Sequence, residues 1–212
     1  MNPLRLLSFL AAAALASGCA MASLSVSALA VSPPSLLVAK KSPRTLVLIV
    51  DPARVPAQMP VLVGGADQGG KLTDVQAFVT RDLKKAFSTY FDEVLVAAPG
   101  QPLPAGAHAV ADVKLERIEV VQTARRTSGV MAYTAGAAAL TWGLGLRLSE
   151  SDEYLYSFAG ESVGTASESP DFVFRSMFES AIGDLLKGYT EKQVHARLLE
   201  APAPAGKPAT RI

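Results

Sequence analysis

One segment limits the folding of this chain more than any other: Thr45–Val50, an unbroken apolar run with the sequence TLVLIV. Asp51-Pro52 closes the run. A strand exposed on one face alternates apolar with polar residues, whereas a strand covered on both faces is apolar along its length. The run therefore predicts a central strand, buried on both faces of a sheet.

Two segments have the apolar spacing of amphipathic helices. The first begins at Thr73, which forms a capping-box pair with Gln76. The second begins at Ser169-Pro170-Asp171, with proline at the first helical position. Thr190 and Gln193 are expected to cap a last short helix. The predicted buried stripes comprise Val75, Phe78, Val79, Leu83, Ala86, Phe87, Tyr90 and Phe91, and then Phe174, Phe178, Ala181, Ile182, Leu185 and Tyr189.

Several further strands are expected after the first helix. In one of them the apolar alternation changes parity, which predicts a β-bulge near Glu116-Arg117. A polar link, Ser149–Asp152, is expected to form a hairpin turn between two others. We predict an α+β fold over residues 44–200, a mostly antiparallel sheet with two main amphipathic helices packed on one face. The expected strands include Glu93–Ala97, Ala109–Val121, Trp142–Leu148 and Tyr154–Phe158.

The segment Gly65–Lys71 fits the G-x-x-x-x-G-K pattern of phosphate-binding loops. In such loops the next residue carries a hydroxyl group that holds Mg²⁺, but here that residue is Leu72. Thr73 comes one position late and already suits a helix cap. We expect a flexible glycine-rich loop and no bound nucleotide.

The remaining polar residues give no catalytic or metal-binding pattern. His108, in an expected loop, and His195 have no neighbour at metal-ligand spacing. Asp112, Glu116 and Glu119 are expected to form the solvated face of a strand, with catalytic carboxylates as the alternative. A Ser-His-Asp triad assembled in three dimensions stays open, although no G-x-S-x-G elbow supports one. We expect no catalytic residue, no metal and no cofactor.

The balance of charge argues against nucleic acid as a partner. The chain has 20 Lys and Arg against 19 Asp and Glu, and loss of Arg5 with an N-terminal signal leaves 19 of each. Such a balance provides no electrostatic attraction to nucleic acid or to an anionic lipid surface.

The N-terminus has the order of a bacterial export signal: Arg5, an uncharged apolar stretch over Leu6–Leu15, and small residues before Cys19. The apolar stretch is too short to span a bilayer as a stable helix. Cys19 is the only cysteine, so no disulfide can form within the chain. This order resembles the lipobox of bacterial lipoproteins, in which the cysteine is acylated and becomes the mature N-terminus.

The resemblance implies removal of residues 1–18, lipidation at Cys19 and membrane attachment through the lipid. The family favours leucine three residues before the cysteine, where this chain has Ala16, so a plain secretory signal is the alternative. Ala20 follows the cysteine, which by resemblance to lipoprotein sorting in two-membrane bacteria implies the outer membrane. Residues 19–43 are expected to be a flexible tether, with a strand at Leu36–Ala39 as the alternative, and residues 201–212 a disordered tail.

The uncharged segment Gly129–Leu146, bounded by arginines, is the best place to look for function. Its many Gly, Ala and Thr residues and its partial alternation favour a loop or short helix that leads into the strand of Trp142. The alternative is an element that contacts a partner or the membrane. The candidate contact residues are Tyr133, Gly136, Leu140 and Trp142.

The order of strands and helices behind a lipobox is similar to that of small envelope lipoproteins such as the ABC-transport auxiliary lipoproteins. Our first hypothesis is a non-enzymatic, lipid-anchored outer-membrane protein that faces the periplasm and binds an envelope protein partner or supports an envelope assembly. The alternative is a lipid-binding or apolar-ligand-binding auxiliary component of a transport system, using the sheet face opposite the helices or the Gly129–Leu146 element; a deep apolar cavity would favour it. A hydrolase is the third hypothesis.

Overall fold

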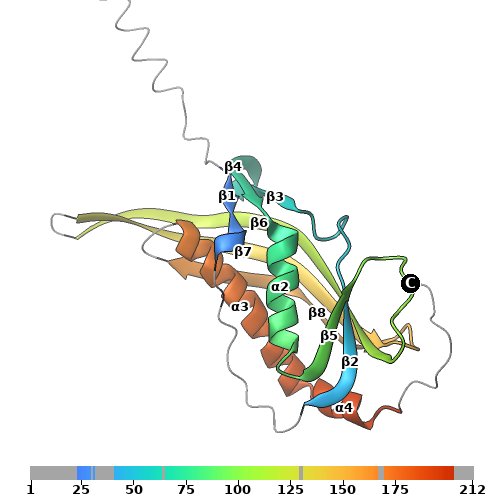
Figure 1. Cartoon of the computed structure of the whole chain (residues 1–212). Helices are drawn as coiled ribbons and strands as arrows, with labels where there is room; N and C mark the ends of the chain where they lie inside the picture. The colour runs from blue at the N-terminus through green and yellow to red at the C-terminus, as the bar shows by residue number, and fades with distance from the viewer. Residues whose placement is uncertain are drawn as a thin grey trace, which may run out of the picture.

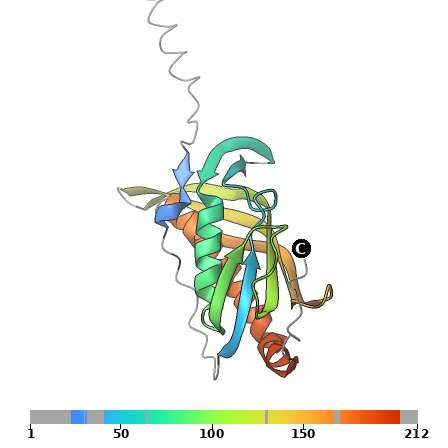
Figure 2. The same ribbon diagram turned by 45° about the vertical axis from the view of Figure 1, so that its right-hand side comes forward.

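The computed structural model describes residues 23–29, 31, 41–63, 65–128, 131–166 and 170–202, in which one eight-stranded sheet carries its helices on one face (Figures 1 and 2). The strands are β1 (Leu24–Ser25), β2 (Ser42–Ile49), β3 (Gln58–Val63), β4 (Ala66–Thr73), β5 (Phe91–Ala97), β6 (Ala107–Ser128), β7 (Met131–Leu148) and β8 (Tyr154–Ala166). The helices are the 3₁₀ helix η1 (Val26–Ala28), α2 (Val75–Phe87), α3 (Pro170–Glu191) and α4 (Val194–Glu200).

The sheet is mixed, so the expectation of a mostly antiparallel sheet is wrong. β2 runs parallel to both β5 and β6, and β3 also runs parallel to β6. The pairs β3–β4, β6–β7 and β7–β8 are antiparallel. The parallel pairs follow from connectivity, because β2 reaches β5 through a crossover that contains α2.

Strand β6 organises the sheet, because it carries β7 along one edge and both β2 and β3 in succession along the other. Between the β2 and β3 pairings, Leu115 N donates to the carbonyl of Arg54, 2.9 Å away, in the link that joins those two strands. The register with β7 shifts between Leu115 and Arg117. The predicted bulge near Glu116-Arg117 is therefore confirmed.

Strand β2 confirms the prediction of a strand covered on both faces. Leu46 and Leu48 belong to the main core beneath the helices. Val47 and Ile49 point the other way and pack with Leu103 in a second, smaller core. The second core explains why the apolar run has no polar alternation.

Both main helices lie on the same face of the sheet, as predicted (Figure 1). Phe78 of α2 and Phe178 of α3 have ring centroids 4.6 Å apart. The predicted capping box is wrong, because Thr73 is the last residue of β4 and pairs with Gln58. Asp74 is the N-cap instead, in the left-handed region at φ 61°, without a side-chain cap hydrogen bond.

All of the glycine-rich segment after Gly65 lies in strand β4, paired with β3, and is not the loop that we expected. The pairing skips residues between Pro60 and Leu62, where β4 carries extra residues in a bulge. Gly70 lies in this bulge at φ 81°, a backbone conformation that L side chains rarely adopt. The glycine-rich composition of this segment is thus explained by an irregular hairpin of β3 and β4.

The expected loop or short helix at Gly129–Leu146 is also wrong, since residues 131–148 form β7 and pair with β6 up to Ser128 and Met131. The pairing of β6 with β3 ends at Val120, and that of β7 with β8 ends at Gly136. Residues 121–128 and 131–135, called the arm below, form a two-stranded ribbon beyond these points (Figures 1 and 2).

In the described part of the chain, no helix has the length and apolar character needed to cross a membrane.

Candidate functional sites

Residues 24–29 and 31, called the strap below, lie on the folded domain, although we expected them to be part of a flexible tether. Strand β1 pairs in parallel with β4, with Leu24 opposite Leu72. Val26 is fully buried and Val31 is 3% exposed, both within the main core. Full burial of a valine side chain stabilises by about 1.5–3 kcal/mol, so two such residues hold the strap on the domain.

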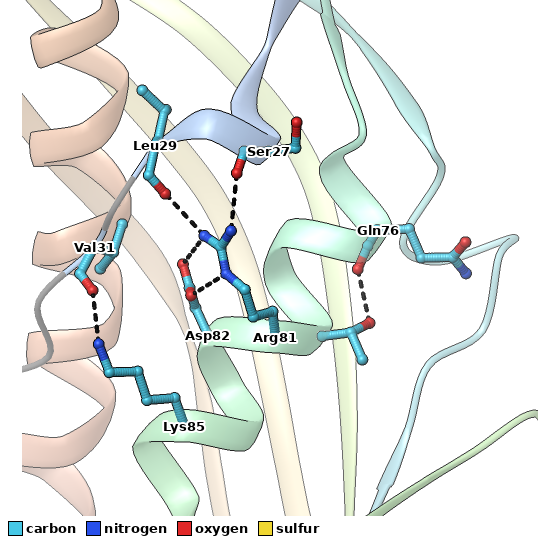
Figure 3. A network of polar contacts seen from close by, with 8 residues as sticks. Ser27, Leu29, Val31, Gln76, Arg81, Asp82 and Lys85 are labelled. Carbon is cyan, nitrogen blue, oxygen red and sulfur yellow. Dashed lines mark hydrogen bonds and ion pairs between the residues drawn. The ribbon is translucent and has the colours of Figure 1, made fainter.

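Arg81 of α2 holds the backbone of the strap (Figure 3). Its Nη1 donates to the carbonyl of Ser27 at 2.9 Å, and its Nη2 donates to the carbonyl of Leu29 at 2.8 Å. The guanidinium also donates through Nε and Nη2 to the carboxylate of Asp82, at 2.8 and 3.2 Å. The hydrogen bond to Asp82 raises the pKa of Arg81 above its ordinary value.

Asp82 explains why Arg81 is held in place. Its carboxylate is only 3% exposed, and a buried charge is tolerated where it is paired and hydrogen-bonded. Two further contacts lie at the ends of the strap: Lys85 Nζ donates to the carbonyl of Val31 at 3.4 Å, and Ser25 Oγ donates to Asp74 at 2.6 Å. Because Arg81 and Lys85 bind main-chain carbonyls, these hydrogen bonds depend little on the side chains of the strap.

The contacts of Arg81, braced by Asp82, with the strap are called the clamp below. Sequence reasoning did not predict the clamp. A signal was present, because Asp82 lies four residues after Phe78 and four before Ala86, within the apolar stripe of α2. A buried carboxylate at a stripe position requires a charged or hydrogen-bonding partner. The location of the strap on that partner is a long-range feature that no local pattern contains.

The four predicted contact residues divide into two pairs. Leu140 and Trp142 are 1% and 3% exposed, so in this fold they lie in the core beneath the helices and are not available at the surface. Their burial follows from the pairing of this part of β7 with β8 under α3. Gly136 lies at the base of the arm, and the backbone of Tyr133 pairs with Arg126 within it. A contact role for these two residues stays a prediction.

Trp142 takes part in a buried polar chain between the sheet and α3. Its Nε1 donates to Ser162 Oγ at 3.2 Å, and the Ser162 hydroxyl donates to Asp184 at 2.7 Å. This chain contains a serine and a carboxylate but no histidine. The polar chain provides hydrogen-bond partners for buried polar groups. Within the described residues it has no histidine to act as the base of a hydrolytic triad.

The cavity beneath the two helices is small. It has a volume of about 20 Å³ and is lined mostly by apolar side chains, Phe78, Leu140 and Phe178 among them, with Asp82 also at its wall. Such a volume suits about one water molecule, whereas ligand pockets measure roughly 300–1,000 Å³. The site offers no room for a lipid chain.

His108 lies on strand β6 and not in the expected loop, and it is 2% exposed. Arg44 Nη1 lies 2.5 Å from His108 Nε2 and donates to the carbonyl of Ala201 at 2.6 Å, beyond the end of α4. Burial, and to a smaller degree the positive charge of Arg44, lower the pKa of His108. Its contacts join the C-terminal helix to the sheet.

The other sequence candidates are not brought together. Asp112 is half-buried on β6, where burial raises its pKa and Arg147 lies 3.8 Å away. Glu119 Oε1 instead accepts from Gly65 N at 3.0 Å. The described ranges contain no group of three His, Cys, Asp or Glu residues placed to hold a metal ion. Cys19 and residues 203–212 lie outside the described residues.

Comparison with known proteins assigns no family. No family model matches the chain, and no curated protein matches it. A protein described as a neuraminyllactose-binding hemagglutinin homologue from Helicobacter pylori has a similar fold, with TM-score 0.44 and 13% identity, covering 80% of this chain and 94% of that one. A DUF330 protein from Xanthomonas campestris has TM-score 0.44 and 14% identity, with coverage of 83% and 96%. Lipoprotein GNA1162 from Neisseria meningitidis has TM-score 0.20 and 10% identity, with coverage of 71% and 98%. At these values the similarities determine neither family nor function.

Proposed function

We propose that this chain is a non-enzymatic envelope protein, anchored to the outer membrane through acylated Cys19 and facing the periplasm, that binds a protein partner at its arm. The lipid anchor is supported by the charge–apolar–small–Cys order of the N-terminus. Partner binding is supported by one observation, the two-stranded arm that extends past the last pairings of β3 and β8.

Both edges of the arm carry main-chain groups that no other strand of the described chain pairs with. Five to eight residues of strand span roughly 15–25 Å. An isolated two-stranded ribbon is marginally stable in water, and an unpaired edge is a template for another strand. We infer that the partner donates an extended segment, which adds to an edge of the arm by main-chain hydrogen bonds.

Charge indicates what kind of segment fits. Between Val121 and Gly136 the sequence contains Arg125 and Arg126 and no acidic residue. In a chain whose overall charge is balanced, this local excess favours an acidic partner strand, which it would also steer during encounter. The small cavity gives no support to the alternative of an apolar-ligand carrier.

The lipid anchor is tested separately from the arm. Cells that express the full-length chain are labelled with an alkyne analogue of palmitate. The wild type should be labelled and remain with the membranes, whereas Cys19→Ala should lose both properties. Equal labelling of the two proteins would contradict lipidation at Cys19.

The arm is tested by photo-crosslinking in living cells. A benzophenone amino acid replaces Tyr133 in the arm, and Tyr154, 53% exposed at the start of β8, as the control position. We expect a crosslinked protein from position 133 only, attached through an acidic, extended segment. Crosslinking to lipid alone, or equally from both positions, would contradict the proposal.

Charge-neutralised variants complete the test. Arg125→Gln with Arg126→Gln should weaken the crosslink several-fold. The control, Lys187→Gln with Lys192→Gln, removes the same charge at and just beyond the C-terminal end of α3 and should leave the crosslink unchanged. Equal effects of the two double variants would show that overall charge, and not the arm, determines binding.

A further inference from the structure

The docked strap limits how far the fold can lie from a lipid on Cys19. Between Cys19 and Leu24 the chain makes five Cα steps. Since each residue spans at most about 3.6 Å, Leu24 lies within roughly 18 Å of the cysteine. If the strap were free as far as Lys41, the same limit would be roughly 80 Å. The clamp therefore decides whether the domain lies on the membrane or far from it.

The strap also determines which part of the domain lies nearest to the lipid. β1 pairs only with β4 among the described strands, so it occupies the edge of that part of the sheet. Leu24 lies opposite Leu72, next to the exposed Lys71, which pairs with Pro60 of β3. In Figure 1 this edge lies at the end of the molecule opposite to the C-terminal end of α3 and α4.

The strap is held by two independent sets of contacts. Arg81, braced by buried Asp82, binds two carbonyls of the strap, while Val26 and Val31 lie in the main core. A segment that only tethers a domain needs neither set. Together they give the lipid-proximal chain a fixed exit point on the domain.

We propose that the edge formed by β1, β4 and β3 faces the phospholipid bilayer, and that the Arg81 clamp sets this orientation. The inference rests on the lipidation of Cys19 that is part of the proposed function. The occupant of the surface is the bilayer that carries the anchor, because the five chain steps from Cys19 to Leu24 keep that surface within reach of it. The far ends of α3 and α4 then face away from the membrane.

The test uses the lipidated, full-length protein in phospholipid vesicles. Cys19 is the only native cysteine and its sulfur is acylated, so a single introduced cysteine takes up a fluorophore at one site. Lys71→Cys reports on the β4 edge, and Lys187→Cys, 72% exposed on α3, reports on the opposite end. The quencher is a phospholipid with a nitroxide on its headgroup.

We expect at least about twofold stronger quenching at position 71 than at position 187, because the chain length restricts only the former. Equal quenching at both positions in membrane-bound protein would overturn the inference and leave the lipid anchor intact. Protein that does not float with the vesicles would contradict the anchor itself, so the two failures are distinguishable.

Release of the strap provides the second part of the experiment. Val26→Ser with Val31→Ser weakens the docking without altering the sheet or α2, and Arg81→Gln removes the carbonyl contacts. In either variant the protein should remain on the vesicles, but the difference between positions 71 and 187 should shrink toward equality. An undiminished difference in the folded Val26→Ser/Val31→Ser variant would show that the clamp does not set the orientation.

Discussion

Gly164 of β8 packs directly on the backbone of Met177 in α3, so that a Cβ atom at position 164 would overlap the main-chain nitrogen of Met177. The helix and the sheet approach each other this closely because glycine has no side chain. This contact sits beside Ser162, where α3 is also hydrogen-bonded to the sheet through Asp184.

Gly164→Ala should therefore destabilise the domain by about 1–3 kcal/mol, since the backbone of α3 has to shift to admit a methyl group. Gly183→Ala, on α3 itself, is the matched control because a Cβ there meets no atom within 4 Å. Alanine has the higher helix propensity, so the control should be neutral or stabilise by up to about 1 kcal/mol. Urea denaturation measures both, and equal losses would contradict the close approach.

Phe87→Ala tests the packing of α2. Phe87 is fully buried, and its ring centroid lies 6.3 Å from that of Tyr189. The loss of the ring should cost about 3–5 kcal/mol. Lys84→Ala, at an exposed position of the same helix, should cost less than about 0.5 kcal/mol. Similar costs for the two variants would mean that α2 presents a different face to the sheet.

Ser162→Ala removes the group that joins Trp142 to Asp184. The buried indole nitrogen then has no acceptor, so the free energy of unfolding should fall by about 1–3 kcal/mol. Ser157→Ala, at an exposed position of the same strand, is the control and should change little. A red or blue shift of the single tryptophan's fluorescence should accompany the first change only.

Acidification should weaken the junction between α4 and the sheet at His108. The folded state lowers the pKa of His108, mainly through burial, so folding favours the neutral imidazole. The unfolded chain then binds more protons below about pH 6.5, and the stability present above that pH is lost as the pH falls. Against burial, the hydrogen bond to the carbonyl of Leu198 favours the charged form; Arg44 favours the neutral form to a smaller degree, and Glu150 opposes it more weakly still.

The measurement is the free energy of unfolding at pH 7.5 and at pH 5.5, for the wild type and for His108→Gln. The wild type should lose stability between these values, and the variant should lose less because one titrating group is gone. A variant with the same loss as the wild type would show that His108 does not cause the pH dependence. Asp112 would not account for such a loss, because burial raises its pKa and acidification then favours the folded state at that group.

The sequence predicted those parts of the fold whose signals are local. The stripes of α2 and α3 repeat at helical spacing, and both helices lie where expected. The parity change at Glu116 locates a bulge without reference to any partner strand. The uniform apolar character of Thr45–Val50 reflects two cores, one on each side of β2.

The rest depends on partners distant in the sequence. The direction of β2 relative to β5 and β6 depends on the crossover connections between the strands. The composition of a strand does not predict these connections. Within β7, Ala137–Ala139 are all small and apolar, so they show no alternation that would distinguish a strand from a loop. Strand β4 was obscured by Gly70, whose positive φ serves a bulge inside the hairpin.

For the candidate sites, too, local features could be predicted and contacts between distant residues could not. Tyr133 and Gly136 belong to an arm that the uncharged composition of their segment did indicate as unusual, whereas Leu140 and Trp142 share that composition and are core residues. The clamp could not be predicted from the sequence, because Arg81 and the strap are separated by about fifty residues of chain.

The pairing of β1 with β4 also imposes an order of events on the molecule. The strap is synthesised first, but its binding site consists of β4 and α2, which follow it by more than forty residues. Until β4 and α2 have been made, the strap has nothing to dock on. Docking of the strap therefore comes last, and under the proposed lipidation of Cys19 the lipid is attached before the folded domain is drawn toward the membrane.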